Sequence, residues 1–194
     1  LIVFVRSSLS RVRVKKRLAA GVGAFAARRF YINLSSKLIT TVSTHTPWQT
    51  ILSVTPNSSA FQGRFWPPGV KKIPQGYGNL RERMERTLLR FPHQPVAIIG
   101  SDIPDISNKH IKNAFAAIGR SDFVFGPSPD GGYWLVGLRM GSLARGLFQN
   151  VRWSSEFALT DTLRNTGIRR AELIEELYDI DNVEDLDQWQ AQRS

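Results

Sequence analysis

The stretch "PVAIIGSDIPDIS", residues 95–107, decides the fold, because a short apolar run ends there on a small residue, a hydroxyl and a carboxylate. Residues 96–99 are all apolar, which is typical of a strand buried on both faces of a sheet. Gly100, Ser101 and Asp102 follow directly. Asp102 therefore either caps a local turn or holds a ligand at the end of the strand.

Apolar runs and helical periodicity alternate along the rest of the chain. Similar apolar runs predict strands at residues 1–5, 50–55, 70–76, 122–127 and 133–138. Periodic apolar residues predict helices at 22–42, 80–88, 108–118, 154–166 and 182–192, whereas residues 171–181 fit either a helix or a strand. This alternation predicts an α/β fold, a three-layer α/β/α sandwich with a mostly parallel mixed sheet, in a single domain of residues 1–194.

The composition limits the partners. The formal net charge is +10, which suits nucleic acid, an anionic membrane surface or a phosphorylated small molecule. Nucleic acid is the less favoured partner, since the basic cluster at residues 6–17 also suits the phosphates of a small ligand. The chain has no cysteine and no uninterrupted apolar window of about 18 residues. We therefore expect no disulfide, no thiolate chemistry and no membrane span, and a cytoplasmic protein.

A basic loop follows the first strand and precedes a long helix. Backbone N–H groups at a helix start, together with Lys15, Lys16 and Arg17, suit phosphate oxygens. The alternative is a solvated basic loop. The loop contains neither G-x-x-x-x-G-K-[ST] nor G-x-G-x-x-G, so a P-loop and a dinucleotide-binding loop are not supported.

Ligands of open α/β sheets bind beyond the carboxyl ends of the strands, where Asp102 is expected. A carboxylate in this position suits Mg²⁺ or Mn²⁺, because both prefer oxygen ligands. Asp181 is open to two interpretations: a second metal ligand, or the N-cap of the last helix, with Glu184 completing a capping box.

The segment "PSPDGGYW", residues 127–134, also has two interpretations. Asp130, Gly131 and Gly132 form a strong hairpin-turn signal, but the glycines would equally let the backbone approach a ligand. Trp153 flanks another candidate segment and suits the wall of a pocket.

Three aromatic residues, Phe61, Phe65 and Trp66, form an apolar patch that suits a lid or an interface between copies in a homo-oligomer.

Six segments together resemble one bacterial family over nearly the whole chain. They are "FVRSSLSRVRVKKRL", "IPQGYGNLRERM", "IIGSDIPDIS", "FGPSPDGGYWLVGL", "VRWSS" and "DIDNVEDL". In this order they are similar to the GT-A-fold transferases known as radical-SAM/selenodomain-associated transferase 1, or as arsenosugar-biosynthesis-type glycosyltransferases. More distantly they resemble the guanylyltransferases of molybdenum-cofactor and 2-phospholactate biosynthesis. The resemblance implies a nucleotide-diphospho-sugar transferase-like GT-A domain.

The family motifs carry roles over to matching positions. The first loop matches at Val14, Lys15, Arg17 and Leu18 but lacks the family's usual Pro and Gly. The resemblance implies a nucleotide and phosphate site at Arg6, Lys15, Arg17, Gln75, Gly76, Gly100 and Ser101. It implies metal ligation by Asp102 and Asp181, catalytic roles for Asp102 and Asp130, and acceptor binding at Gly131, Gly132 and Trp153. Asn79 stands where the family's second motif has Asp.

These observations predict a metal-dependent transferase with a nucleotide or nucleotide-sugar donor and a small-molecule acceptor. Glycosyl transfer is favoured, and the alternative is a nucleotidyltransferase acting on a phosphorylated acceptor. A second alternative is a degenerate protein that binds nucleotide or nucleic acid without catalysis.

Overall fold

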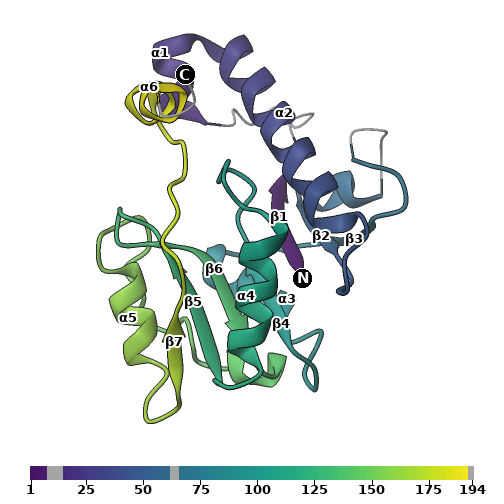
Figure 1. Ribbon diagram of the computed structural model, residues 1–194, viewed down its shortest axis with the longest axis vertical. Coiled ribbons are helices and arrows are strands. Elements are labelled where there is room, and N and C mark those ends of the chain that lie inside the picture. The colour runs from purple at the N-terminus through teal and green to yellow at the C-terminus, as the bar shows by residue number, and fades with distance from the viewer. Residues whose placement is uncertain (8–14, 62–65, 192–194) are drawn as a thin grey trace.

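The structure, a computed structural model, describes residues 1–7, 15–61 and 66–191, and the predicted basic loop at 8–14, with Val14, lies outside them. Within the described residues, seven strands form one sheet in the order β3-β2-β1-β4-β6-β5-β7 (Figure 1). Their bounds are β1 Ile2–Arg6, β2 Ile51–Thr55, β3 Lys71–Pro74, β4 Val96–Ile99, β5 Phe123–Pro127, β6 Tyr133–Leu138 and β7 Ala171–Leu173. Only β6 is antiparallel to its neighbours, β4 and β5, among these strands. The predicted mostly parallel mixed sheet is confirmed.

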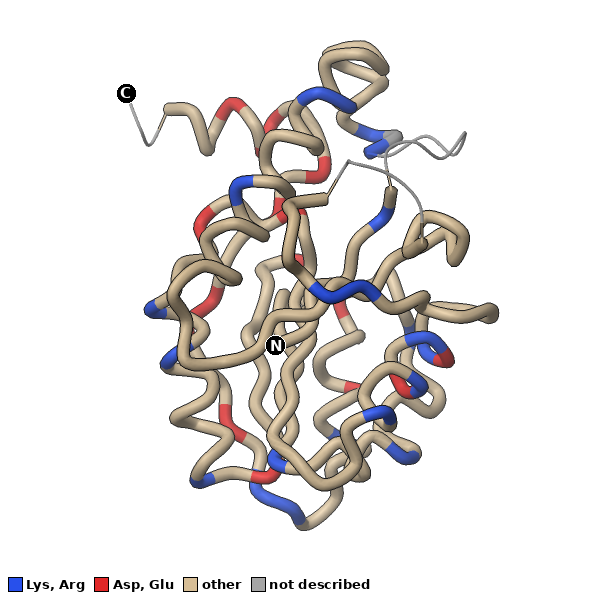
Figure 2. Tube along the Cα trace, turned by 90° about the vertical axis from the view of Figure 1, so that its right-hand side faces the viewer, with Lys and Arg blue, Asp and Glu red and all other residues tan. Residues whose placement is uncertain are grey.

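Helices cover both faces of the sheet. The α-helices are α1 Lys16–Val22, α2 Ala24–Ser43, α3 Leu80–Leu88, α4 Asn108–Ile118, α5 Ala158–Arg164 and α6 Val183–Ala191, and two 3₁₀ turns are η1 Asn57–Ala60 and η2 Gly141–Ala144. Figure 2, turned by 90° from Figure 1, shows the strands between coiled segments on either side. This arrangement is the predicted three-layer sandwich.

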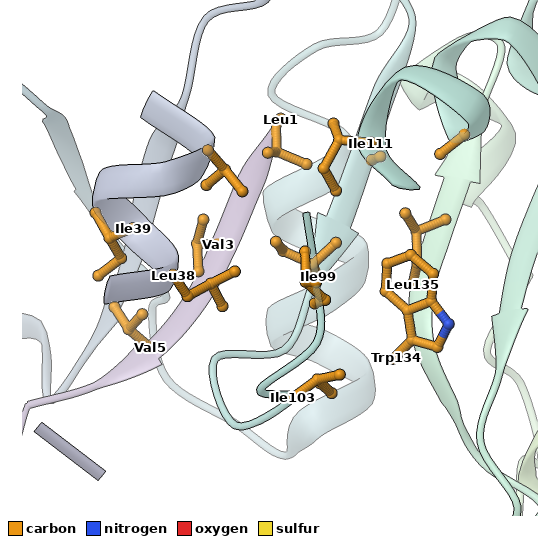
Figure 3. Close-up of a cluster of buried hydrophobic side chains, with 14 of the residues drawn as sticks. Leu1, Val3, Val5, Leu38, Ile39, Ile99, Ile103, Ile111, Trp134 and Leu135 are labelled. Atoms are coloured by element: carbon orange, nitrogen blue, oxygen red, sulfur yellow. The ribbon is translucent and has the colours of Figure 1, made fainter. Parts of the chain in front are cut away.

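Alternation along the strands fills two separate cores. On one face Val3, Val5 and Ile99 pack against α2 and α4, as Figure 3 shows for Leu38, Ile39 and Ile111. The other face packs against α3 and η2, and its buried residues are Ile2, Val96, Ile98, Phe123, Phe125, Val136, Leu138, Met84, Leu88, Ala144, Leu147 and Phe148. Because β1 and β4 lie in the middle of the sheet, their carboxyl ends are held from both sides.

A third, smaller core lies beyond the carboxyl ends of these strands. There α1, the first half of α2 and α6 form a unit that we call the helical cap, with α1 and α6 next to each other in Figure 1. Its buried apolar residues are Leu18, Ala27, Ile180 and Leu186. The packing is close, because a Cβ added at Gly21 would lie 2.1 Å from Val183 Cγ2. The cap therefore brings α1 and α2 together with the C-terminal helix α6 beyond the sheet.

Several predicted boundaries were wrong for local reasons. The helix predicted at 22–42 is α2, but the preceding residues, predicted as loop, form the separate helix α1, which Gly23 with φ 85° divides from α2. The helix predicted at 154–166 is the shorter α5, and within 171–181 only β7 is regular. In the predicted aromatic patch, Trp66 is buried and Phe61 is exposed, while Phe65 lies outside the described residues.

Within the part of the chain that the structure describes, no helix has the length and apolar character needed to cross a membrane.

Candidate functional site

Asp102 lies just beyond β4, in a turn with little freedom. The Gly100 N–H donates to the carbonyl oxygen of Trp134 at 3.1 Å. A Cβ at Gly100 would lie 2.8 Å from Ile103 Cδ1, so a larger residue would require the buried Ile103 side chain to shift. Ser101 and Ile103 are buried, while the Asp102 side chain is 34% exposed. The buried neighbours anchor the turn and leave the carboxylate available at the strand end.

Lys15 links Asp102 to the helical cap. Its Nζ lies 2.8 Å from Asp102 Oδ2 and 2.7 Å from Asp181 Oδ1, and its side chain is only 6% exposed. Burial alone would lower the pKa of Lys15, but the two carboxylates outweigh it and hold that pKa above its usual value. Lys15 also has φ 50°, a left-handed conformation that is uncommon for a residue with a side chain.

Asp181 does not cap the last helix as one interpretation predicted. The capping carboxylate is that of Asp185, whose Oδ2 accepts hydrogen bonds from the N–H groups of Asp181 and Asn182 at 2.8 and 3.0 Å. Asn182 Oδ1 accepts in return from the Asp185 N–H at 2.9 Å. The Asp181 carboxylate is therefore free of the capping role and pairs with Lys15.

Asp179 is a site residue that the sequence reasoning missed. One oxygen each from Asp102, Asp179 and Asp181 lie within 4.8 Å of one another. Burial, then the charges of Asp181 and Asp102, raise the pKa of Asp179 to about 6. The "DID" spacing was an available signal, because residues two apart on an extended segment point to the same side.

This carboxylate set fits a divalent cation. Mg²⁺ and Mn²⁺ take oxygen ligands, and three carboxylates converge here. The Lys15 ammonium already lies between Asp102 and Asp181 and supplies part of the positive charge that they require. A cation bound by these two residues would therefore compete with Lys15.

One side of Asp102 opens into a cavity of about 560 Å³ that we call the basic cavity. Arg6, Lys15 and Arg83 supply its cations. The other lining residues are Phe4, Val5, Tyr31, Thr55, Gln75, Leu80, Gly100, Ser101, Asp102 and Asp181. It lies at the carboxyl ends of β1 and β4, where α/β folds bind ligands.

Hydrogen bonds to the backbone and to neighbouring side chains fix the polar groups that line the basic cavity. Buried Gln75 donates from Nε2 to the carbonyl oxygens of Ser53 at 2.9 Å and Val5 at 3.3 Å. Its Oε1 accepts from Arg83 Nη1 at 2.8 Å. The Tyr31 hydroxyl donates to the Arg6 carbonyl oxygen at 3.0 Å and lies 3.2 Å from Ser101 Oγ. Burial raises the pKa of Tyr31, so this hydroxyl stays protonated.

Two residues predicted for phosphate binding lie apart from this lining. Arg17 is exposed on the first turn of α1. The Gly76 N–H donates to Asn57 Oδ1 at 2.9 Å, and the φ of 85° at Gly76 sets the turn after β3. The structure thus brings together Arg6, Lys15, Gln75, Gly100 and Ser101 with Asp102.

On the other side of Asp102 lies a second cavity, of about 290 Å³, that we call the aromatic cavity. It shares Phe4, Leu80, Gly100 and Asp102 with the basic cavity. Its further lining is Met84, Ile98, Ile103, Ser128, Asp130, Gly132, Tyr133, Trp134, Val136, Trp153, Ser154, Ser155, Ala158 and Asp179. Among the described residues that line it, three are aspartates and none is Lys or Arg.

The predicted hairpin and the predicted ligand-binding segment are one structure. Asp130 Oδ1 accepts from the Gly132 N–H at 2.9 Å and stabilises the turn between β5 and β6. Gly131 has φ 80°, and a Cβ there would lie 2.1 Å from the carbonyl oxygen of Glu156. Asp130 also lines the aromatic cavity together with Trp153. Asp130 is therefore placed both to hold the turn and to face a ligand.

Trp153 is fixed in the cavity wall by its neighbours. Its ring packs edge-on to Tyr133 at 6.3 Å and tilted against Phe148 at 5.9 Å between centroids. Next to it, Arg152 forms an ion pair with buried Asp161, Nε to Oδ2 at 2.8 Å and Nη2 to Oδ1 at 2.9 Å. This pairing ties the Trp153 segment to α5.

With the geometry in place, the comparisons with known proteins identify the family. The bacterial family described as "Uncharacterized protein conserved in bacteria (DUF2064)" matches residues 38–155, more than half of the chain. The chain belongs to the DUF2064 family. No curated protein matches the sequence. The narrower resemblance to radical-SAM/selenodomain-associated transferases stays a prediction.

Solved structures share the fold of this DUF2064 protein. A "putative nucleotide-diphospho-sugar transferase" from Desulfovibrio desulfuricans G20 has a TM-score of 0.89 at 22% identity, covering 100% of this chain and 86% of that one. A 2-C-methyl-D-erythritol 4-phosphate cytidylyltransferase from Thermus thermophilus has a TM-score of 0.55 at 13% identity, covering 98% and 97%. A CMP:2-keto-3-deoxy-manno-octonic acid synthetase has a TM-score of 0.57 at 12% identity, covering 99% of this chain and 96% of that one. The predicted nucleotide-diphospho-sugar transferase-like fold is confirmed.

The matched DUF2064 region contains only part of the site. It includes Gln75, Arg83, Asp102 and Asp130, whereas Lys15 and Asp181 lie outside it. Arg6 at the end of β1, and Lys15 and Asp181 next to the helical cap, therefore supply charged residues that the matched region does not contain.

Proposed function

We propose that the protein is a metal-dependent transferase that moves a glycosyl group from a nucleotide sugar to a small-molecule acceptor. The observation that carries this proposal is the position of Asp102 between a cavity lined by cations and a cavity without them. A nucleotide sugar has the matching asymmetry, with a diphosphate at one end and an uncharged sugar at the other.

The basic cavity is proposed to take the nucleotide end. Arg6 offers positive charge to the phosphates, and Arg17 extends it at the start of α1. Lys15 is held between Asp102 and Asp181 as their counter-ion. Gln75, Gly76, Gly100 and Ser101 shape the same site around β1, β3 and β4. Asp102 and Asp181 would hold Mg²⁺ or Mn²⁺, with Asp179 beside them. A bound divalent cation would neutralise charge on the departing diphosphate.

The aromatic cavity is proposed to bring the acceptor to the sugar. An acceptor hydroxyl would attack the anomeric carbon, and the bond from that carbon to the diphosphate oxygen would break. The nucleoside diphosphate would leave with the electron pair, and Asp130 would take the hydroxyl proton. Gly131 and Gly132 keep the backbone close to this position, and Trp153 offers a flat apolar surface to a sugar ring.

The lining of the aromatic cavity favours glycosyl over nucleotidyl transfer. A nucleotidyltransferase of this kind would bind a phosphorylated acceptor, whose charge requires a nearby cation. The described lining offers the carboxylates of Asp102, Asp130 and Asp179 and no Lys or Arg. An uncharged acceptor fits these surroundings better than an anionic one.

A thermal-shift experiment tests the proposal. The protein would be melted with nucleotide sugars and nucleoside triphosphates, with and without Mg²⁺ or Mn²⁺. A ligand at about 100-fold its Kd stabilises by roughly 2.7 kcal/mol, which gives a clear shift. We expect metal-dependent stabilisation by a nucleotide sugar, and its loss in Asp102→Ala. Release of a nucleoside diphosphate, but not pyrophosphate, on adding acceptor candidates would complete the test.

Asp187→Asn is the matched control, because it removes an exposed carboxylate from α6 outside both cavities. It should respond like the wild-type protein. Release of pyrophosphate instead of a nucleoside diphosphate would show that the protein catalyses nucleotidyl transfer and not glycosyl transfer. A folded sample that responds to no nucleotide, but binds DNA with an affinity that falls steeply with salt, would overturn the transferase proposal.

A further inference from the structure

The basic cavity contains a pair of arginines whose charges are not balanced. Arg6 and Arg83 line it from β1 and α3. Elsewhere Arg120, Arg152 and Arg164 each form an ion pair with a carboxylate. Across the described ranges 1–7, 15–61 and 66–191, neither Arg6 nor Arg83 does so. The two charges therefore face the cavity together.

Arg83 is held in this position by neutral groups. Its Nη1 donates to Gln75 Oε1 at 2.8 Å, and its Nε donates to the Asn79 carbonyl oxygen at 3.2 Å. The side chains of Asn79 and Glu82 form a reciprocal capping box that fixes the start of α3. These contacts orient the Arg83 guanidinium without neutralising its positive charge, because both acceptors are uncharged.

Arg6 is anchored through its backbone. Its N–H donates to the Tyr31 hydroxyl at 3.1 Å, and the same hydroxyl donates back to its carbonyl oxygen at 3.0 Å. This leaves the guanidinium exposed at the cavity. Burial, and then the charge of Arg6, lower the pKa of Arg83, as expected for two cations that line one cavity. An anion between them would relieve the repulsion between these like charges.

Lys15 does not offer the same free charge. Its ammonium contacts two carboxylates, Asp102 and Asp181, at 2.8 and 2.7 Å. A phosphate that approached Lys15 would also approach those carboxylates. The unbalanced positive charge of the cavity lies at Arg6 and Arg83 instead.

We propose that Arg6 and Arg83 form a clamp for the diphosphate of the nucleotide ligand, with Gln75 as a positioning residue for Arg83. The proposal rests on the proposed function, since it assigns the phosphate end of the same donor. It also gives Lys15 a separate role, as the counter-ion of the acidic cluster. Guanidinium groups suit this task because they donate two parallel hydrogen bonds to phosphate oxygens.

The test measures binding of pyrophosphate and of uridine and guanosine diphosphate by titration calorimetry, with Mg²⁺ present because nucleotide binding is expected to depend on the metal. Arg83→Gln and Arg6→Gln should each weaken binding at least tenfold, or about 1.4 kcal/mol. Arg83→Lys should weaken binding by a smaller factor, because lysine keeps the positive charge but lacks the two parallel N–H donors of the guanidinium. Arg90→Gln is the matched control, since it removes the same charge from an exposed position at the end of α3, outside the cavity lining.

The results separate this inference from the proposed function. Equal losses in Arg83→Gln and Arg90→Gln would show a diffuse charge effect and overturn the clamp, as would unchanged binding in Arg83→Gln and Arg83→Lys. In either case nucleotide-sugar turnover by the wild-type protein would keep the proposed function. Selective loss in Arg6 and Arg83 variants, without turnover of any nucleotide sugar, would support the clamp and remove the transferase assignment. Circular dichroism and melting temperatures would confirm that each variant is folded.

Discussion

The basic cavity and the aromatic cavity meet at Asp102 but differ in charge and in how they are built. The basic cavity combines Lys15 and Asp181 from the helical cap with Arg6 from β1 and Arg83 from α3. The aromatic cavity is formed by the β5–β6 hairpin and the segment before α5, with Trp153 in its wall. One is suited to a polyanion and the other to a ring without negative charge.

Under the proposed function, the two ends of one ligand would lie at two parts of the sheet. The central strands β1 and β4 end at the charged side, where both neighbouring cores restrict movement. The hairpin lies nearer the β7 edge, in the part of the chain that shapes the aromatic cavity. Variation in the hairpin could therefore change the acceptor without changing the nucleotide site.

The largest expected effect is at Asp102, which both cavities share. Asp102→Asn keeps the shape of the side chain but removes its charge. We expect turnover of a nucleotide sugar to fall by about 10²–10³-fold, the size of effect found when one group that stabilises transition-state charge is lost. Rates of nucleoside diphosphate release would measure this. A loss below tenfold would show that Asp102 does not face the reacting diphosphate.

The second-largest effect is expected at Lys15, which lines the basic cavity and not the aromatic cavity. Lys15→Met leaves the carboxylates of Asp102 and Asp181 without their counter-ion. We expect a loss of about 1–2 kcal/mol in the free energy of unfolding, less than for a fully buried pair because both carboxylates keep contact with water.

Divalent cations make this prediction specific. Mg²⁺ or Mn²⁺ should raise the melting temperature of Lys15→Met more than that of the wild-type protein, because the ammonium no longer competes for the two carboxylates. Exposed Lys37→Met on α2 is the control for loss of a lysine. Equal metal responses in all three proteins would contradict a cation site at Asp102 and Asp181.

The sequence predicted those parts of the site that depend on neighbours in the chain. The apolar run 96–99 followed by Asp102 predicted a strand end, and "PDGG" predicted the hairpin that holds Asp130. Both depend on backbone preferences over a few residues. Helix α1 was missed because its residues belong to a basic, glycine-containing segment that also fits a loop, so the sequence did not separate α1 from the loop before it.

The sequence could not decide roles that depend on distant partners. Asp181 suited a helix cap, but the capping carboxylate is that of Asp185, and the partner of Asp181 is Lys15, 166 residues away. In the sequence, Arg83 is one of several arginines close together, with Arg81, Arg86 and Arg90, and nothing local distinguishes it. Only the fold brings it to Gln75 and Arg6 and separates it from exposed Arg90.

A smaller effect is expected on the aromatic side, at Trp153. Trp153→Ala should raise the KM for the acceptor about tenfold, or about 1.4 kcal/mol, through loss of the flat cavity wall. The Kd for the nucleotide should stay within twofold, because Trp153 does not line the basic cavity. Trp153→Phe should recover most of the acceptor affinity. A parallel loss of nucleotide affinity would mean that the two cavities do not bind separate parts of the ligands.

The smallest effect is a pH dependence of stability, carried by Asp161 behind the aromatic cavity. Hydrogen bonds from Arg152 lower the pKa of Asp161 from its ordinary value of 3.8 to about 2. A carboxyl whose folded-state pKa is depressed stabilises the fold fully above the unfolded value and loses that contribution as pH falls toward the folded value. Asp161→Asn should therefore lower the melting temperature at pH 7, and its difference from the wild-type protein should shrink between about pH 4 and pH 2. Nucleotide affinity should not change, since the pair orders only the Trp153 segment and α5. A difference that stays constant over this pH range would show that Asp161 stabilises α5 without its ionic pairing to Arg152.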